Sequence, residues 1–373
     1  MTTKKNTINK LIPWGKPCFI GKERDYVLKA LDSTWISGGE FVDRLEADFA
    51  RIIGKKFSVS TTSGTTALHL ALMAAGVGAG DEVIVSGFTF AAPANMVLQT
   101  GAKPIFADID RDTWCIDCGS VEKCLSKRTK AVIAVHVYGN VCDMDRIEEI
   151  ATSNNLVVIE DVAEAAFSKY KGRFAGSIGD LGCFSFQAAK TITTGEGGIV
   201  ITDNPEFNNE MKILRNHGMR PEKRYWHDQI GYNYRLTNLQ ASLGCAQLEM
   251  LENILKEKER VYTEYKNRLS DVAGIKMQHI PEYVAPVIWT IAIKIDPDYF
   301  LGDRDYIMKK LLEANIETRP GFYPFSVMPV YDCPKLPVAE EVSRNIISLP
   351  SFASIKNSEI EYICHKLLDL MRK

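Results

Sequence analysis

The feature that most constrains the fold of this chain is a series of short, almost entirely apolar runs in its first two thirds. The runs are EVIVSGFTF (82–90), PIFADID (104–110), AVIAVHVYG (131–139), LVVIEDVAEA (156–165) and GGIVITD (197–203). Helical patterns such as 65–76 and 120–127 separate them. Strands that are apolar on both faces and alternate with helices are typical of a parallel sheet covered on both sides. The pattern predicts a doubly wound α/β fold, in which ligands bind beyond the carboxyl ends of the strands.

The pattern changes near residue 245. Residues 247–272 form a long, strongly charged helical pattern, and the remainder mixes strands such as 287–295 with proline-rich turns and a terminal amphipathic helix. We therefore predict two domains. Residues 1–245 would form an N-terminal arm and a large domain, and residues 246–373 a connecting helix and a small C-terminal α+β domain.

Composition excludes several classes of function. The 373 residues include 45 Lys and Arg against 47 Asp and Glu, so the net charge of −2 gives no general support for binding nucleic acid. No apolar run approaches the ~18 residues that cross a bilayer, and the first residues lack the apolar core of a secretory signal. Nine scattered cysteines and six histidines match neither a disulfide framework nor metal-ligand spacing. We expect a cytoplasmic protein with no metal, membrane or nucleic-acid partner.

Two short motifs could bind an anionic or cationic group. Ser63-Gly64-Thr65-Thr66 precedes an Ala- and Leu-rich helix, where free N–H groups favour phosphate, although Ser at a helix start is often only a cap. Asp161 ends the apolar run 156–161, which would direct its carboxylate into the ligand crevice. A helix-capping role for Asp161 fits the sequence equally well.

Lys190 is the candidate nucleophile. It lies in CFSFQAAKTITTGEGG (183–198), among small and hydroxylated residues, with Glu196 as its one charged neighbour. A lysine in a partly dry pocket has a lowered pKa and can attack carbonyl groups, whereas a merely packed lysine would have no such role. The interpretation gains strength when a lysine, a strand-end carboxylate and a phosphate-binding helix start occur together, because pyridoxal 5′-phosphate requires all three. Phe90 could stack on its ring, and Ser185 could donate to its phosphate.

These motifs resemble those of the fold-type-I aminotransferases of the DegT/DnrJ/EryC1/StrS family, which act on nucleotide-linked keto sugars. The resemblance covers nearly the whole chain. Its marks are SGTTAL (63–68), GDEVIV (80–85), FTFAAPAN (88–95), GAKPIFADID (101–110), IEDVAEA (159–165), FSFQAAKTITTGEGG (184–198), RNHGM (215–219) and GYNYRLTNLQASLGCAQLE (231–249). It implies a large pyridoxal-phosphate-binding domain followed by a smaller domain.

The resemblance also implies roles for individual residues. Lys190 would join the cofactor covalently and carry the proton during transamination. Asp161 would pair with the ring nitrogen, Phe90 would stack on the ring, and Glu164 would lie close to the cofactor. The phosphate would be held by Gly64, Thr65, Ser185 and, from a neighbouring subunit, Asn233. Shared sites of this kind imply an obligate homodimer.

Within the family, segments 224–228 and 317–324 resemble the enzymes that aminate GDP-4-keto-6-deoxymannose to GDP-perosamine with glutamate as donor. The candidate substrate-binding residues are Trp35, Arg319, Tyr323 and Ser326. Ser326 stands where that subgroup has His. A Gln at position 187 is similar to what the family's cyclitol-ketone aminotransferases have there. Two alternatives therefore stay open. One is ping-pong transamination of a cyclitol ketone or small phosphorylated ketone, with glutamate or glutamine as donor, and the other is a non-enzymatic regulatory domain.

Overall fold

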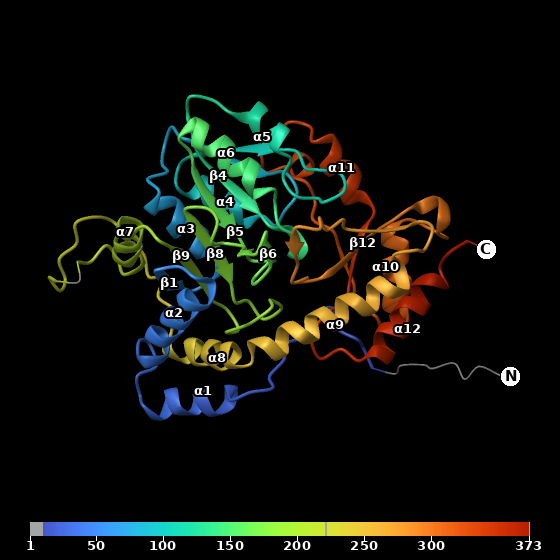
Figure 1. Ribbon diagram of the computed structural model, residues 1–373, viewed down its shortest axis with the longest axis horizontal. Helices are drawn as coiled ribbons and strands as arrows, with labels where there is room; N and C mark the ends of the chain where they lie inside the picture. Colours follow the sequence, from blue (N-terminus) through green and yellow to red (C-terminus); the bar gives the residue numbers. More distant parts are fainter. Residues whose placement is uncertain (1–9, 221, 373) are drawn as a thin grey trace.

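The computed structural model describes residues 10–220 and 222–372 (Figure 1), so the first nine residues of the predicted N-terminal arm lie outside the described residues. Its central element is a seven-stranded sheet of order β1-β9-β8-β5-β4-β2-β3. The strands are β1 Phe57–Thr61, β2 Glu82–Ser86, β3 Lys103–Ala107, β4 Thr129–Val135, β5 Val157–Asp161, β8 Leu181–Ser185 and β9 Gly198–Thr202. Strands β3, β2, β4, β5 and β8 are parallel, and β9 runs antiparallel to both of its neighbours. The doubly wound, mostly parallel sheet predicted from the sequence is therefore present.

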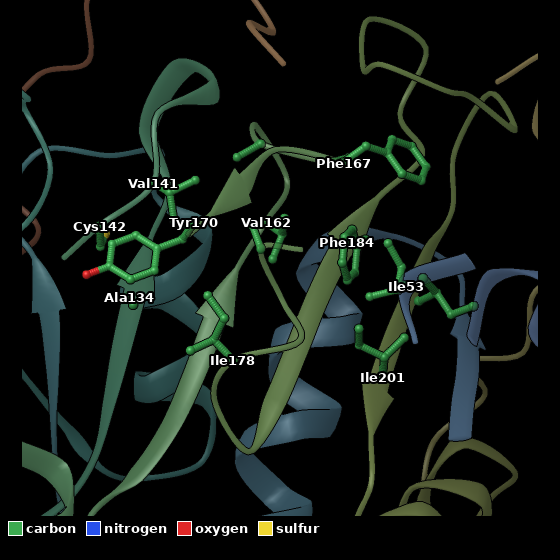
Figure 2. Packing of buried hydrophobic residues seen from close by; sticks show 14 of the residues in the cluster. Ile53, Ala134, Val141, Cys142, Val162, Phe167, Tyr170, Ile178, Phe184 and Ile201 are labelled. Atoms are coloured by element: carbon green, nitrogen blue, oxygen red, sulfur yellow. The ribbon is translucent and has the colours of Figure 1, made fainter. Parts of the chain in front are cut away.

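Helices cover both faces of this sheet. Successive strand residues contribute to different cores, since Val132, Ala134 and Phe184 belong to one buried cluster and Ile133 and Cys183 to the other. The first face packs against α2 (Glu40–Ile53), α6 (Met144–Asn154) and α8 (Asn238–Glu249), and the second against α3 (Gly64–Ala74), α4 (Ala92–Gln99) and α7 (Pro205–Arg215). Helix α1 (Glu23–Asp32) lies on α8, and α5 (Cys118–Cys124) contacts β3 and α6. Figure 2 shows the first cluster, where side chains from β8, β9 and the α2 end lie together. Close packing of this kind leaves little room for the strands to shift against the helices.

A smaller sheet follows, of order β10-β12-β14-β13. Its strands are β10 Ile275–Met277, β12 Ile291–Ile295, β13 Arg319–Pro320 and β14 Ile346–Leu349. It packs with α9 (Leu251–Leu269), α10 (Arg304–Glu313) and α12 (Asn357–Leu368) around a third buried cluster, while α11 (Pro337–Arg344) contributes to the second cluster of the large sheet. A three-stranded ribbon consists of β11 (Val284–Ala285), β6 (Lys169–Tyr170) and β7 (Arg173–Phe174). Near the N-terminus, Ile12 forms an isolated parallel bridge with Ile316, and both residues are buried in the third cluster.

The helical pattern at 247–272 is two helices rather than one. Helix α8 ends at Glu249 and α9 begins at Leu251, with Met250 between them in a non-helical conformation. In Figure 1, α9 runs from the large sheet to the smaller one. Residue 245 lies inside α8, and the two-domain division stays a prediction. In the part of the chain that the structure describes, no helix combines the length and apolarity needed to span a bilayer.

Candidate active site

A cavity of about 720 Å³ lies beyond the carboxyl ends of β4, β5 and β8 and beside the start of α3. This is the place where open α/β sheets bind ligands. The sequence-predicted residues that line it are Gly64, Thr65, Phe90, Asp161, Glu164, Ser185, Lys190 and Arg319. Residues separated by more than 250 positions in the chain therefore meet around one cavity.

Lys190 lies in the segment between β8 and β9, where its backbone N–H donates to the carbonyl of Gln187 at 2.8 Å. Its side chain is only 13% exposed, and Nζ is 3.9 Å from Oε1 of Glu164. Burial lowers the pKa of Lys190, and the nearby carboxylates of Glu164 and Asp161 oppose that shift. A lysine with a lowered pKa supplies more of the neutral amine that attacks an aldehyde.

Asp161 is the last residue of β5 and is buried. Its Oδ1 accepts a hydrogen bond from the N–H of Ala163 at 3.0 Å. Burial raises the pKa of Asp161, with Lys190 and His136 acting in the opposite direction. A buried carboxylate at a cavity wall is costly unless it meets a cationic partner, and the protonated nitrogen of a pyridine ring would be such a partner.

Glu164 follows in the turn after β5 and is also buried. Its Oε2 accepts a hydrogen bond from the N–H of Tyr138 at 2.9 Å. Burial raises the pKa of Glu164 to about 7, against the opposing effect of Lys190. Near neutral pH this side chain can therefore either hold or release a proton beside the Lys190 amine.

The start of α3 forms the anion-binding end of the cavity. Ser63 caps the helix by accepting from the N–H of Thr66 at 3.1 Å, and Thr66 Oγ1 accepts in return from the N–H of Ser63 at 3.0 Å. Gly64 lies so close to the end of β8 that a Cβ atom there would be 2.7 Å from Cβ of Ser185. This close approach brings the helix start, Thr65 and the Ser185 hydroxyl to one end of the cavity, which suits a phosphate group.

Phe90 and Arg319 lie on other walls. Phe90 is 61% exposed, and its ring centre is 6.5 Å from that of Phe322, which leaves its surface free for a flat ligand. Arg319 is on β13, where its Nη2 donates to Oε1 of Glu317 at 2.6 Å. A guanidinium at the cavity wall can bind a carboxylate through two parallel hydrogen bonds.

Four predicted site residues are not part of this cavity. The Ser326 hydroxyl donates to Oε1 of Glu340 at 2.8 Å, and Tyr323 Oη accepts from Arg304 at 3.2 Å. Trp35 is 71% exposed and lines a separate hollow formed by residues 34–38. Asn233 is exposed and pairs through its backbone with Asn216. The side chains of Ser326 and Tyr323 are thus engaged in other contacts, and Trp35 and Asn233 do not line this cavity.

An aromatic wall was not predicted from the sequence. Tyr138 stacks between Phe322, at 5.3 Å, and Trp289, at 6.4 Å between ring centres. Nζ of Lys190 lies 3.6 Å from the centre of the Trp289 ring. Tyr138 and Trp289 were assigned to the apolar strand patterns 131–139 and 287–295, yet β4 ends at Val135 and β12 begins at Ile291. The sequence signal that could have indicated this wall is an aromatic residue a few positions from a run that forms a buried strand.

A comparison with protein families decides the identity. The profile of the DegT/DnrJ/EryC1/StrS aminotransferase family matches residues 17–368. The chain belongs to this family. It is 41% identical over 361 residues to GDP-perosamine synthase of Escherichia coli O157:H7, covering 96% of this chain and 98% of that protein. It is also 41% identical to GDP-perosamine synthase of Caulobacter vibrioides, covering 93% and 95%.

Solved structures agree with this assignment. Helicobacter pylori PseC, an aminotransferase involved in the biosynthesis of pseudoaminic acid, superposes with a TM-score of 0.91 at 26% identity, covering 97% of this chain and 99% of that one. Spr1654 of Streptococcus pneumoniae in its PMP form gives a TM-score of 0.90 at 28% identity, covering 96% and 97%. The chain is a pyridoxal-phosphate-dependent aminotransferase of fold type I, as the sequence predicts. The buried Asp161, the partly dry Lys190 and the Gly64–Ser185 contact fit that cofactor.

Proposed function

We propose that this enzyme transfers the amino group of glutamate to the keto group of a GDP-linked 4-keto-6-deoxy sugar, giving a GDP-perosamine-type product by a ping-pong reaction. The observation that carries the proposal is the convergence of Lys190, Asp161 and the α3 start on one cavity. The sugar assignment draws on the 41% identity to two GDP-perosamine synthases over nearly the whole chain.

The chain's own residues have distinct tasks in this proposal. The cofactor supplies, when bound, an aldehyde that accepts the amino group and a ring that withdraws electrons. Lys190 provides the amine that attaches the cofactor and carries a proton at its Nζ atom. Asp161 holds a proton at the ring nitrogen, while the start of α3 with Gly64, Thr65 and Ser185 binds the phosphate. Glu164 accepts or returns a proton close to Nζ.

Arg319 is our candidate for binding the carboxylate of the amino donor. Its pairing with Glu317 uses Nη2, and the planar fork presents further N–H donors. The cavity also has the size of a typical small-molecule site, in the range of ~300–1,000 Å³. A donor such as glutamate or glutamine and the reacting part of a sugar would occupy it in turn.

The alternative acceptors are a cyclitol ketone and a small phosphorylated ketone. Gln187, the residue that suggests a cyclitol ketone, lines the cavity but accepts a hydrogen bond from the N–H of Ala189 at 2.8 Å. The side-chain oxygen of Gln187 thus bonds within its own loop, and the side-chain nitrogen is the atom that could contact the keto substrate. Ser326 contacts Glu340 instead of the cavity and gives the smaller ketones no support.

We further propose a homodimer with shared sites. Asn233 is exposed, and the apolar side chains of Phe19, Leu31 and Trp35 are more than half exposed, which favours burial against a second copy.

A cytoplasmic location is also proposed, because all nine cysteines are free thiols, as in a reducing compartment.

An acceptor panel tests the function. Purified enzyme with pyridoxal phosphate and glutamate would be offered GDP-4-keto-6-deoxymannose, a uridine-linked keto sugar, a cyclitol ketone and a small phosphorylated ketone, with product mass as the readout. We expect amination of the GDP-sugar, and none by Lys190→Ala. Preference for the uridine-linked keto sugar, for a cyclitol ketone or for a small phosphorylated ketone, or the absence of any product, would contradict the proposal.

A further inference from the structure

Trp289 is held in place through all of its polar groups. Its backbone N–H donates to the carbonyl of Tyr138 at 3.1 Å, and its indole N–H donates to the carbonyl of Ala189 at 2.7 Å. Its own carbonyl accepts from Nζ of Lys258 at 2.6 Å. Three segments distant in sequence therefore fix one indole ring, and the residue after Ala189 is the reactive lysine.

Lys258 is a buried residue of α9 that does not line the 720 Å³ cavity, but it shares a hollow of about 20 Å³ with Lys190 and Trp289. Besides the Trp289 carbonyl, its Nζ donates to the carbonyl of Ser351 at 3.0 Å. Burial lowers the pKa of Lys258 to about 7. A buried lysine is costly, so its two hydrogen bonds indicate a positioning role at the junction of α9 with the segments next to β12 and β14.

Gly139 allows the Trp289 segment to come this close. A Cβ at Gly139 would lie 2.5 Å from the carbonyl oxygen of Val287 and 3.0 Å from the backbone nitrogen of Trp289, and its φ of +110° is one that other residues rarely adopt. The Ser168 hydroxyl adds a bridge by donating to the Gly139 carbonyl at 2.8 Å and accepting from the N–H of Val287 at 2.8 Å. The backbone that leads into Trp289 is therefore held in place as well.

The indole faces the Lys190 amine, with Nζ 3.6 Å from the ring centre. The charged groups that act on this amine are the carboxylates of Glu164 and Asp161. An ammonium group over an indole face is attracted by the negative face of the ring. The flexible lysine side chain is thereby kept beside Glu164 instead of sampling many rotamers.

We propose that Trp289 is a positioning residue for the Lys190 amine and holds it within reach of the cofactor while the amine is not bound to the cofactor. Lys258 in turn fixes Trp289 through the hydrogen bond to its backbone carbonyl. The proposal rests on the proposed function only in taking Lys190 as the reactive lysine. The Lys190 amine is released in the first half-reaction and rejoins the cofactor at the end of the second, so a defined resting place keeps it near the reacting atoms in between.

The test compares Trp289→Leu and Trp289→Phe with the wild type. The pKa of Lys190 would be measured in full-length protein after removal of the cofactor, as the pH dependence of reductive methylation at Lys190 by formaldehyde and cyanoborohydride, quantified by peptide mass. Leu keeps the amine dry but removes the ring face, so we expect the Lys190 pKa to fall by about one unit. Turnover of the holoenzyme should fall by about tenfold at unchanged cofactor content. For Trp289→Phe we expect a Lys190 pKa and a turnover between those of the wild type and of Trp289→Leu. If Trp289→Leu does not fold, the comparison of Trp289→Phe with the wild type serves as the test.

Lys258→Met tests the support from α9, with Lys256→Met as the matched control because Lys256 is exposed on the same helix. We expect Lys258→Met to shift the Lys190 pKa in the same direction as Trp289→Leu, and Lys256→Met to leave it unchanged. An unchanged or raised Lys190 pKa in the Trp289 variants, or equal behaviour of the two α9 variants, would overturn the inference. Persistent activity of Lys190→Ala would instead overturn the proposed function, so the two failures are distinguishable.

Discussion

At the scale of single residues, burial acts on three ionisable groups at one cavity and favours the neutral form of each. It raises the pKa values of Asp161 and Glu164 and lowers that of Lys190. The same burial that makes these groups costly to ionise brings the pKa of Glu164 to about 7, which suits proton transfer near neutral pH.

Glu164→Gln should change how stability depends on pH. The folded-state pKa of about 7 exceeds the ordinary value of 4.5, so the folded protein binds the extra proton between these pH values and its stability falls as the pH rises through that window. Gln keeps an acceptor for the N–H of Tyr138 but does not titrate. Relative to wild type, the cofactor-free variant should gain stability as the pH rises from 4.5 to 7, by up to about 3 kcal/mol. Urea unfolding at several pH values measures this difference, and parallel curves for the two proteins would contradict it.

Asp161→Asn should slow the reaction while the protein still folds. The amide is nearly isosteric and can still accept from the N–H of Ala163, but it carries no charge to hold a proton at the ring nitrogen. We expect kcat to fall by about a hundredfold or more, the scale of losing one aligned electrostatic contact. Initial rates normalised to bound cofactor provide the measurement, and wild-type kinetics would remove Asp161 from this role.

At the scale of elements, the contact between the α3 start and the end of β8 sets the shape of the phosphate-binding end. Gly64→Ala would place a methyl group 2.7 Å from Cβ of Ser185, so the helix start has to move away from the strand. We expect cofactor affinity to fall by about ten- to a hundredfold, since misplaced donors lose much of their hydrogen-bond energy.

Gly78→Ala is the matched control for this substitution, because a Cβ there meets no atom within 4 Å. Fluorescence titration of the cofactor-free proteins with pyridoxal phosphate would compare the two. Equal affinities for both variants would show that the close approach at Gly64 does not matter for the cofactor.

The elements also show what the sequence could and could not predict. Lys190, Asp161 and the Ser63–Thr66 helix start were predicted because each follows from a local pattern at a strand or helix end. Trp289 and Tyr138 were missed because their importance comes from packing between segments about 150 residues apart, which no local pattern reveals. The contacts of Tyr323 with Arg304 and of Ser326 with Glu340 were not predicted either, because they also depend on how side chains of separate elements pack.

At the scale of the whole molecule, the exposed Asn233 makes shared sites testable. If each site combines Lys190 of one subunit with Asn233 of the other, a mixed dimer of Lys190→Ala and Asn233→Ala chains contains one fully intact site. Each variant alone should be strongly impaired. Co-expression, or unfolding and refolding of the mixture, should restore about a quarter of wild-type activity, since about half of the dimers are mixed and each has one intact site. No recovery in a mixture shown to contain mixed dimers would contradict the shared site.

The most direct test of the central claim is chemical identification of the lysine that holds the cofactor. Holoenzyme would be reduced with borohydride, digested and analysed by peptide mass for the added pyridoxyl group. Lys190 and Lys258 both have lowered pKa values through burial, but only Lys190 lines the 720 Å³ cavity. The account predicts the pyridoxyl group on Lys190 and an unmodified Lys258, and attachment at Lys258, at another lysine or at none would contradict it.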